Sequence, residues 1–388
     1  MKIGLVSPYD WSYPGGVRDH VWHLANEFMD QGHDVRILAP ASGPKRKIPE
    51  KNVYKIGWTT PIPANGSIAR VVVFDPALTM RVRRVLQREN FDVLHIHEPL
   101  VPGLSLAALR AAQCITVATF HASSEVNLTS TFNLAYASLV PFLRPMWRRL
   151  DGRIVVSSAT YKFITHYFPA DYRIIPNGIN LHHFGQDIKP FPALKDGKQN
   201  ILFVGRFEKR KGAKYLLRAI PAIREHHPNT RFIFVGEGRL RPGFQRYVER
   251  RGWRDVVFTG YVSNEDKARY FASADVFCAP ATGGESLGIV LLEAMAAGKP
   301  IVASNVSGYA TVVSHGVDGL LTPPRSSEDL AEAIGQLLTY EPLRQRFILA
   351  GQQKVHEYVW PHVAAQVLDY YLELIDELKH AKGRKIYG

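Results

Sequence analysis

Two glutamates separated by an apolar run mark the segment of the chain with the clearest chemical potential. The sequence Gly-Gly-Glu-Ser-Leu-Gly-Ile-Val-Leu-Leu-Glu ends at residue 293, so Glu285 would lie near the start of a helix and Glu293 about two turns further along. The residues between them are almost wholly apolar, and carboxylates in a buried element need partners. Sugar and ribose hydroxyls would serve, and the amino-terminal end of the helix would favour a phosphate. A salt-bridged acid on a buried helix is the alternative interpretation of Glu293.

Paired cations precede this segment, in Val-Gly-Arg-Phe-Glu-Lys-Arg-Lys-Gly at residues 204–212. Arg206 and Lys211 would lie at the carboxyl end of a strand, where open α/β sheets bind ligands. Two fixed cations at that place suit a diphosphate. A solvated basic loop would have the same composition, so both interpretations stay open.

The first half of the chain offers a glycine pair and a histidine. Gly15 and Gly16 lie between the first expected strand and the first expected helix, where they would let a ligand approach the backbone. A tight turn is the alternative. The pair is not a G-x-G-x-x-G motif, which disfavours a dinucleotide cofactor. His121 ends an expected strand and would reach a cleft, although a lone histidine is more often structural.

The elements that must position these residues form two successive α/β series. Apolar runs predict strands at 2–7, 93–96, 115–120, 154–157 and 172–175, and a second series at 201–204, 232–235, 256–262, 276–279 and 301–303. Helical spacing predicts helices at 17–29, 213–226, 265–274 and 287–297. The pattern predicts two Rossmann-like, doubly wound domains, 1–178 and 179–360, that face a central cleft. An amphipathic helix within 361–388 is expected to pack back on the first domain.

Composition narrows the class of protein. The chain has 388 residues, 46% of them apolar, with 48 Lys and Arg against 35 Asp and Glu for a net charge of +13. Disorder is excluded, and the basicity favours an anionic partner such as nucleic acid, an acidic membrane or a phosphorylated ligand. The two cysteines, Cys114 and Cys278, exclude a disulfide framework and favour a cytosolic setting. The amino terminus lacks a signal-peptide pattern, and no apolar run is long enough to span a bilayer.

The glycine pair, the basic loop and the two glutamates together resemble a retaining glycosyltransferase of the GT-B fold, family 4. Further segments resemble the phosphatidyl-myo-inositol mannosyltransferases over essentially the whole chain. These segments are Ser-Pro-Tyr at 7–9, Pro-Ile-Pro-Ala-Asn-Gly-Ser-Ile-Ala-Arg at 61–70, Leu-His-Ile-His-Glu-Pro at 94–99, Ala-Thr-Phe-His at 118–121 and Ile-Pro-Asn-Gly at 175–178.

This resemblance implies transfer of mannose from GDP-mannose to the inositol of a membrane phospholipid, with retention of configuration. It implies that Arg206 and Lys211 hold the donor diphosphate, and that Glu285 contacts the mannose and Glu293 the ribose. His121 matches an essential histidine near the reacting sugar. Further donor contacts are implied for Gly16, Val262, Lys267, Leu287, Gly288 and Ile289, and acceptor contacts for Tyr9, Asn65, Ser67 and Arg70.

Three positions depart from the family pattern, all on the acceptor side. Ala64 stands where the family has a tyrosine, Arg18 replaces a glutamine, and Ala122 replaces a threonine. The donor chemistry is unaffected by these changes. A different phosphoinositol lipid or another anionic acceptor therefore stays open, and Arg18 would add a phosphate contact.

The sequence holds no Asp-x-Asp motif, so neither a dedicated metal clamp nor a prosthetic group is expected. Cationic side chains and helix amino termini would stabilise the leaving diphosphate instead. We favour attack by the acceptor hydroxyl on the face that the diphosphate leaves, with the leaving phosphate accepting the proton. A route through a covalent intermediate is the precedent from retaining hydrolases.

Residues 78–88 predict an amphipathic helix with an apolar face and a basic face. Its arginines are Arg81, Arg83, Arg84 and Arg88. An ordinary surface helix is the alternative interpretation, whereas the resemblance implies contact with an anionic membrane. The apolar segment 132–147 is interrupted by prolines and would border a lipid groove rather than span a bilayer. The expected location is the cytoplasmic face of the cell membrane.

Three other classes of protein are alternatives to this interpretation. A family 4 enzyme with another nucleotide sugar and a soluble sugar or sugar-phosphate acceptor is the main one. A dinucleotide oxidoreductase lacks its fingerprint motif. A nucleic-acid-binding protein would explain the charge, but no recognised motif accompanies it, so no nucleic-acid partner is expected.

Overall fold

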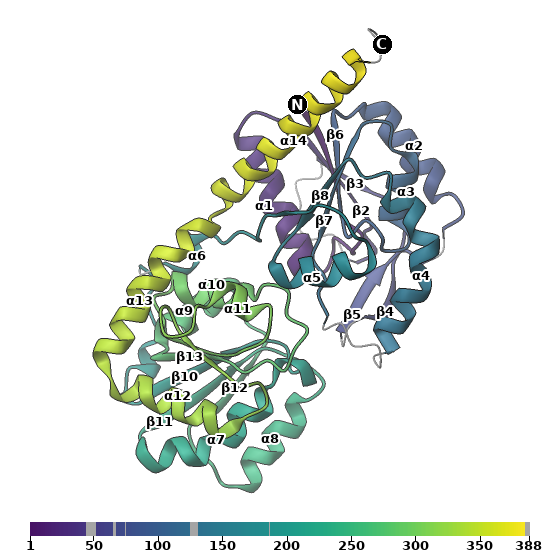
Figure 1. Cartoon of the computed structure of the whole chain (residues 1–388). Helices are drawn as coiled ribbons and strands as arrows, with labels where there is room; N and C mark the ends of the chain where they lie inside the picture. Colours follow the sequence, from purple (N-terminus) through teal and green to yellow (C-terminus); the bar gives the residue numbers. More distant parts are fainter. Residues whose placement is uncertain (44–51, 65–66, 74, 125–130, 186, 385–388) are drawn as a thin grey trace. The chain divides into compact units, whose positions relative to one another are not determined.

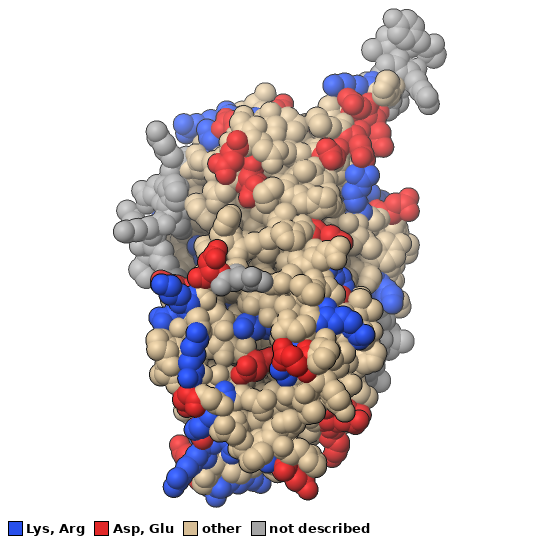
Figure 2. All heavy atoms as spheres, turned by 90° about the vertical axis from the view of Figure 1, so that its left-hand side faces the viewer, with Lys and Arg blue, Asp and Glu red and all other residues tan. Residues whose placement is uncertain are grey.

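A computed structural model describes residues 1–43, 52–64, 67–73, 75–124, 131–185 and 187–384 (Figure 1). The chain divides into two compact units. The first unit comprises Met1–Gly178 together with Trp360–Gly388, and the second comprises Ile179–Val359. Figure 2 shows that lysines and arginines are interspersed with acidic side chains on one face of the molecule.

The first unit is built on a seven-stranded parallel sheet with the strand order β3-β2-β1-β6-β7-β8-β9. These strands are β1 (Lys2–Val6), β2 (Asp34–Ala39), β3 (Val53–Lys55), β6 (Val93–His97), β7 (Ile115–Phe120), β8 (Gly152–Val155) and β9 (Arg173–Ile174). A separate antiparallel hairpin pairs β4 (Thr60–Ala64) with β5 (Ser67–Val71). The helices are α1 (Gly16–Asp30), α2 (Leu78–Glu89), α3 (Leu104–Ala111), α4 (Thr131–Trp147), α5 (Ser158–Tyr167) and α14 (Trp360–Arg384).

The second unit has a six-stranded parallel sheet with the order β12-β11-β10-β13-β14-β15. Its strands are β10 (Gln199–Val204), β11 (Thr230–Val235), β12 (Val256–Gly260), β13 (Val276–Ala279), β14 (Ile301–Ser304) and β15 (Leu320–Thr322). Its helices are α6 (Leu181–Phe184), α7 (Ala213–His226), α8 (Arg241–Arg250), α9 (Asn264–Ser273), α10 (Ile289–Ala296), α11 (Tyr309–Val312), α12 (Ser327–Thr339) and α13 (Glu341–Val355).

Both sheets reverse their strand order once. In the first unit the chain winds outward from β1 to β3 on one side and from β6 to β9 on the other, and in the second unit the same reversal falls between β10 and β13. Open α/β sheets bind ligands beyond the carboxyl ends of the strands at such a reversal. The loops after β1 and β6, with the neighbouring loop after β7, and the loops after β10 and β13 are therefore the places where each unit can build a site.

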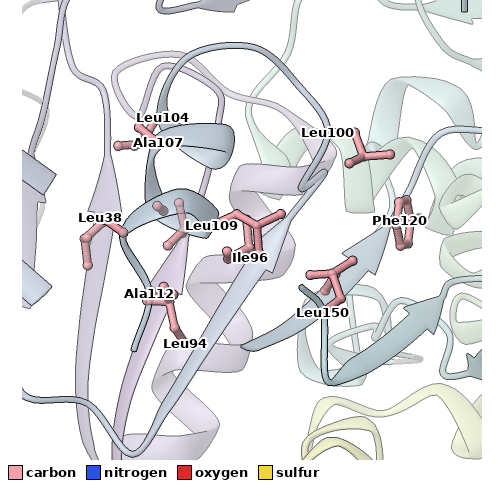
Figure 3. Packing of buried hydrophobic residues seen from close by; sticks show 14 of the residues in the cluster. Leu38, Leu94, Ile96, Leu100, Leu104, Ala107, Leu109, Ala112, Phe120 and Leu150 are labelled. Atoms are coloured by element: carbon pink, nitrogen blue, oxygen red, sulfur yellow. The ribbon is translucent and has the colours of Figure 1, made fainter. Parts of the chain in front are cut away.

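Apolar side chains bury both faces of each sheet. In the first unit, Leu94 and Ile96 of β6 pack with Leu104 and Leu109 of α3 in one cluster (Figure 3). On the opposite face of that sheet a second cluster combines α1 with α14, including Val363, Val367, Tyr371 and Leu374. The first unit is thus completed by a helix that follows the second unit in the chain.

Several predicted boundaries differ from the structure for local reasons. The helix predicted from residue 287 begins at Ile289, because Gly288 has a φ of 84° and lies outside helical geometry. The strand predicted over 256–262 ends at Gly260, whose φ is 80°. Pro141 and Pro145 lie inside α4, which forms despite them. None of the described helices is long and apolar enough to cross a membrane.

Candidate active site

A basic turn after β10 is pressed against the end of β13 in the second unit. Residues Lys209–Lys211 form a 3-10 turn, and Gly212 follows with a φ of 70°. A Cβ at Gly212 would lie 1.7 Å from the carbonyl oxygen of Pro280. The Thr282 N–H donates to the Arg210 carbonyl at 2.7 Å. Only glycine permits this approach, which brings the turn beside the loop that carries Glu285.

Glu285 is buried and lies between two of the cations of this turn. Arg210 Nη1 donates to its Oε1 at 2.6 Å, and Lys211 Nζ donates to its Oε2 at 3.0 Å. Arg206 is half exposed, with its Nη1 3.2 Å from Glu208 Oε1. Charge-assisted bonds of this kind are about twice as strong as neutral ones, so Glu285 holds two cations at the carboxyl ends of β10 and β13.

Arg210 was not singled out from the sequence. Three cations in a row, 209–211, are equivalent in composition. Because Gly212 and the Thr282 bond set the direction of the turn, two of them reach Glu285 while Lys209 is exposed to solvent. The salt bridge itself could not be read from the spacing of the residues.

Glu293 also has a cationic partner. Lys267 Nζ of α9 donates to Glu293 Oε1 of α10 at 2.7 Å, and both side chains are mostly buried. The alternative interpretation of Glu293, a salt-bridged acid on a buried helix, therefore describes it in the absence of a ligand. Val262 is half-buried and packs on the neighbouring apolar cluster.

The amino-terminal end of α10 faces the same loop. Leu287 is buried, and Gly288 is pressed against Tyr309, whose ring carbons would lie 2.6 Å from a Cβ at Gly288. Gly308 is equally constrained, because a Cβ there would lie 2.0 Å from the Glu285 carbonyl oxygen. The first N–H groups of a helix have no partner within it, so Ile289 and its neighbours offer donors to an anion beside Glu285.

Histidines gather at the carboxyl ends of β6 and β7 in the first unit. His97 is the last residue of β6, and His121 directly follows β7. His97 Nδ1 and His121 Nε2 are 3.0 Å apart. His20 of α1 completes the group, with its ring centroid 4.8 Å from that of His121 and 5.2 Å from that of His97.

His20 and His97 were missed as site residues, although a signal existed for one of them. The two expected strands that end near His97 and His121 lie side by side, with His97 opposite Thr119. Because His121 is two residues beyond Thr119, the two histidines lie at the same end of the sheet. No spacing rule would have brought His20 from the helix to the same place.

Glu98 fixes the backbone beneath this group. Its carboxylate accepts the backbone N–H groups of His121 and Ala122, each at 2.7 Å. Glu98 has a φ of 48°, a left-handed conformation that costs a non-glycine residue free energy. Burial raises the pKa of Glu98 to about 7, and the two backbone bonds oppose that shift.

A buried chain of hydrogen bonds through His95 lies next to these histidines. His95 bonds through Nδ1 to Tyr371 Oη of α14 and through Nε2 to Thr119 Oγ1, both at 2.6 Å. The His95 ring stacks on that of His97 with 4.4 Å between centroids. Burial lowers the pKa of His20 to about 4 and that of His95 to about 3, and it lowers the pKa values of His97 and His121 in the same direction.

Mild acid is expected to destabilise the first unit. Because the folded-state pKa values of the four histidines lie below 6.5, the unfolded chain binds more protons below that pH. Their stabilisation is complete above pH 6.5 and is lost as the pH falls through the folded-state values, about 4 for His20 and about 3 for His95. Glu98, with its raised pKa, acts in the opposite direction but is one group against four.

Urea unfolding at pH 6.5 and pH 5 tests this expectation. Tryptophan fluorescence reports mainly the first unit, which holds five of the six tryptophans: Trp11, Trp22, Trp58, Trp147 and Trp360. We expect a lower free energy of unfolding at pH 5. An unchanged or higher value at pH 5 would contradict the assignment of four neutral buried histidines.

The glycine pair lies at the start of α1 with free space beside it. Gly15 has a φ of −177°, which any residue adopts, and neither glycine has a positive φ. An added Cβ at Gly15 or Gly16 would meet no atom of the described residues within 4 Å. A tight turn therefore does not explain the pair, whereas open access to the backbone suits the ligand interpretation.

The residues expected on the acceptor side lie near the hairpin. Tyr9 forms a β-bridge with Val71, and burial raises its pKa. The Arg70 guanidinium lies 4.2 Å from the centroid of the Tyr13 ring, and Arg18 lies 5.5 Å from that of Trp11. Asn65 lies outside the described residues, as do the side chains of Ser67 and Ala64.

The amphipathic helix α2 buries Leu78 and Val82 and exposes its basic side. The arginines Arg81, Arg83, Arg84 and Arg88 are all exposed. Arg81 forms an ion pair with Asp75, whose negative charge offsets that of the Arg81 guanidinium.

Comparison with known proteins defines the class. Residues 14–183 match the sequence model described as Glycosyltransferase Family 4, and residues 185–354 match the one described as Glycosyl transferases group 1. The fold resembles a sucrose-phosphate synthase from Thermosynechococcus elongatus, with a TM-score of 0.77 and 21% identity over 97% of this chain and 99% of that one. The chain is a family 4 glycosyltransferase with the GT-B fold.

Closer relatives narrow the family. A phosphatidyl-myo-inositol mannosyltransferase of Mycobacterium leprae is 42% identical over 96% of both chains. One of Mycolicibacterium smegmatis is 39% identical over 96% of this chain and 93% of its own. The chain belongs to the family of phosphatidyl-myo-inositol mannosyltransferases. The predicted pair of parallel α/β sheets, the enzyme class and the family are thereby confirmed.

Proposed function

We propose that this enzyme transfers mannose from GDP-mannose to the inositol ring of a phosphatidylinositol-type lipid, with retention of configuration, at the cytoplasmic face of the membrane. The observation that carries the proposal is the 39–42% identity, over 96% of the chain, to enzymes named for that class of acceptor. The basic turn, Glu285 and the Glu293–Lys267 pair supply the matching donor chemistry in the second unit.

Binding of the nucleotide sugar would replace salt bridges of the second unit with contacts to the donor. Lys211 and Arg206 would bind the diphosphate, and the backbone N–H groups at 287–289 would donate hydrogen bonds to its oxygens or to sugar hydroxyl oxygens. Glu285 would then accept hydrogen bonds from the hydroxyl groups of the mannose. Glu293 would accept ribose hydroxyls, with Lys267 and Val262 beside the guanine. Gly16 would approach the diphosphate through its open backbone.

The reaction breaks the bond between mannose C1 and the diphosphate oxygen and forms a bond between C1 and an inositol oxygen on the same face. The inositol proton passes to the departing phosphate oxygen, which the cations make a better leaving group. The His121 ring, held by His97, would lie beside the reacting sugar and orient its hydroxyls. Its backbone position is set by the carboxylate of Glu98.

On the acceptor side, Tyr9, Arg70 and Arg18 would contact the inositol phosphate, with Asn65 and Ser67 as further partners. Arginine suits a phosphate because its planar fork donates two parallel hydrogen bonds. Ala64, Arg18 and Ala122 depart from the family pattern in this region. They are the specific observation that favours a second candidate, a family 4 enzyme with another nucleotide sugar and a soluble sugar or sugar-phosphate acceptor.

Product analysis separates the two candidates. The purified enzyme would be incubated with a panel of GDP- and UDP-sugars and either phosphatidylinositol vesicles or soluble inositol phosphate and sugar phosphates. Mass spectrometry should find one hexose added to phosphatidylinositol with GDP-mannose alone. A hexose added only to a soluble acceptor would support the second candidate, and transfer from a UDP-sugar alone would overturn the choice of donor.

Binding to anionic vesicles is expected to depend on the exposed arginines of α2. Each Lys or Arg near an anionic surface contributes about 1 kcal/mol, and screening over about 8 Å confines this to contact distances. We expect the quadruple variant Arg81→Gln, Arg83→Gln, Arg84→Gln, Arg88→Gln to bind at least about tenfold more weakly in flotation assays.

A matched control removes the same charge elsewhere. Exposed arginines of the second unit, Arg239, Arg246, Arg250 and Arg254, would be changed to glutamine together. This control should float like the unmodified enzyme. If both quadruple variants lose binding equally, net charge rather than α2 is responsible, and if neither does, α2 is an ordinary surface helix.

A further inference from the structure

Three buried histidines converge in the first unit: His20 of α1, His97 at the end of β6, and His121 directly after β7. His20, His97 and His121 each place one ring nitrogen within 4.8 Å of the other two. We propose that they form a binding site for one divalent transition-metal ion that prefers imidazole nitrogen, with Zn²⁺ as the reference ion, and that occupancy inhibits the enzyme. The inhibition, but not the binding, rests on the proposed function.

The spacing suits such an ion with little rearrangement. A tetrahedral zinc ion holds nitrogen ligands at about 2.0–2.1 Å, which places neighbouring ligand atoms about 3.3 Å apart. His97 Nδ1 and His121 Nε2 are already 3.0 Å apart. The ion would take the place of the hydrogen between these two rings, and that proton would move to the other nitrogen of its own ring. The third nitrogen, at most 4.8 Å away, is brought closer by small ring rotations.

The group also holds polar atoms that lack partners. His20 Nδ1 and Asn177 Oδ1 are buried without a hydrogen-bond partner among the described residues. Leaving a buried polar atom unpaired is costly, so an ion that engages these two atoms would remove that cost. The Asn177 side chain lies beside both His20 and His121, and its oxygen is a candidate for the fourth position.

The surroundings supply order and charge. The His95 ring stacks on His97, and Trp360 packs edge-on against His20 with 5.1 Å between centroids. Ligands fixed in this way lose little freedom on binding an ion. The buried Glu98 carboxyl group accepts the His121 backbone N–H, and a nearby dication would favour its ionised form. Coordination would occupy the His121 ring and so remove it from the reacting sugar.

Titration of the metal-free enzyme tests the site directly. We expect isothermal titration calorimetry with Zn²⁺ to find one tight site per chain, and Co²⁺ to give the visible absorption of a tetrahedral site. The His20→Asn variant, which keeps a polar side chain of similar size, should bind Zn²⁺ at least about 100-fold more weakly. The control His183→Ala removes an exposed histidine from the second unit and should bind Zn²⁺ normally.

A measurement on the unmodified enzyme covers the case in which His20→Asn fails to fold. In long-range ¹H–¹⁵N spectra of the 15 histidine rings, one equivalent of Zn²⁺ should shift the signals of the three histidines. Absence of tight binding, equal binding by His20→Asn, or shifts confined to other histidines would overturn the site.

The inhibitory part has its own readout. Zn²⁺ at one equivalent should suppress transfer by the unmodified enzyme and by His183→Ala, and chelation should restore it. Tight binding at the three histidines without loss of transfer would overturn inhibition. If GDP-mannose and phosphatidylinositol prove to be the wrong substrates, the calorimetry and the spectra still decide the metal site.

Discussion

His121→Ala is expected to abolish mannosyl transfer while the first unit stays folded. Removing one positioned hydrogen-bonding group that acts in the transition state typically costs about 10²–10³ in rate, and we expect a loss of at least that size. The fold should survive because Glu98 bonds to the backbone N–H groups of His121 and Ala122 rather than to the imidazole. Binding of GDP, which the second unit is proposed to carry, should be unchanged.

The control for this variant is His166→Ala, which removes an exposed histidine from the same unit. Transfer would be followed by release of GDP, GDP binding by calorimetry and folding by circular dichroism. The assignment fails if His121→Ala retains transfer within a few-fold of the unmodified enzyme. Loss of GDP binding along with transfer would instead place His121 in donor binding.

Lys211→Ala is expected to lower kcat/KM by about 10²–10³, the usual cost of removing one donor to a developing anion. The loss of Lys211 would also change the environment of Glu285. Without Lys211, Glu285 retains Arg210 as a cationic partner, but a buried carboxylate beside the diphosphate site is less well neutralised. The variant should therefore lose affinity for GDP as well as rate.

Lys209→Ala is the matched control, because it removes the same charge from an exposed position of the same turn. Kinetics with GDP-mannose and titration with GDP would be compared for both variants. If Lys209→Ala is impaired as much as Lys211→Ala, the general charge of the loop matters rather than the geometry set by Gly212. Lys211→Ala with normal kinetics would refute the diphosphate assignment.

The parallel sheets were predictable because their strands are short apolar runs between turn residues. The run predicted over 276–279 coincides with β13, and the run predicted over 201–204 lies within β10, which begins two residues earlier at Gln199. The strand predicted over 172–175 likewise contains the brief strand β9. The brief strand β3 has no such signal, and it is held by pairing with β2, which depends on tertiary contacts rather than on its own composition.

A site residue was predictable where a charged or titratable side chain followed the carboxyl end of a predicted strand. Glu285, Lys211 and His121 met that condition. The partners of these residues did not, because a salt bridge such as Arg210–Glu285 depends on a glycine turn whose direction no spacing rule specifies. His20 was hidden for a related reason, since its helix reaches the histidines of β6 and β7 only through the packing of α1 on the sheet.

The return of α14 to the first unit has a consequence for synthesis on the ribosome. Val363, Val367 and Leu374 belong to the apolar core beside α1, yet they are translated after the whole second unit. The second unit, continuous from Ile179 to Val359, can fold as soon as it emerges. The first unit is made earlier but must wait with one face of its sheet uncovered, so nascent chains expose apolar surface that is prone to aggregation until α14 has been made.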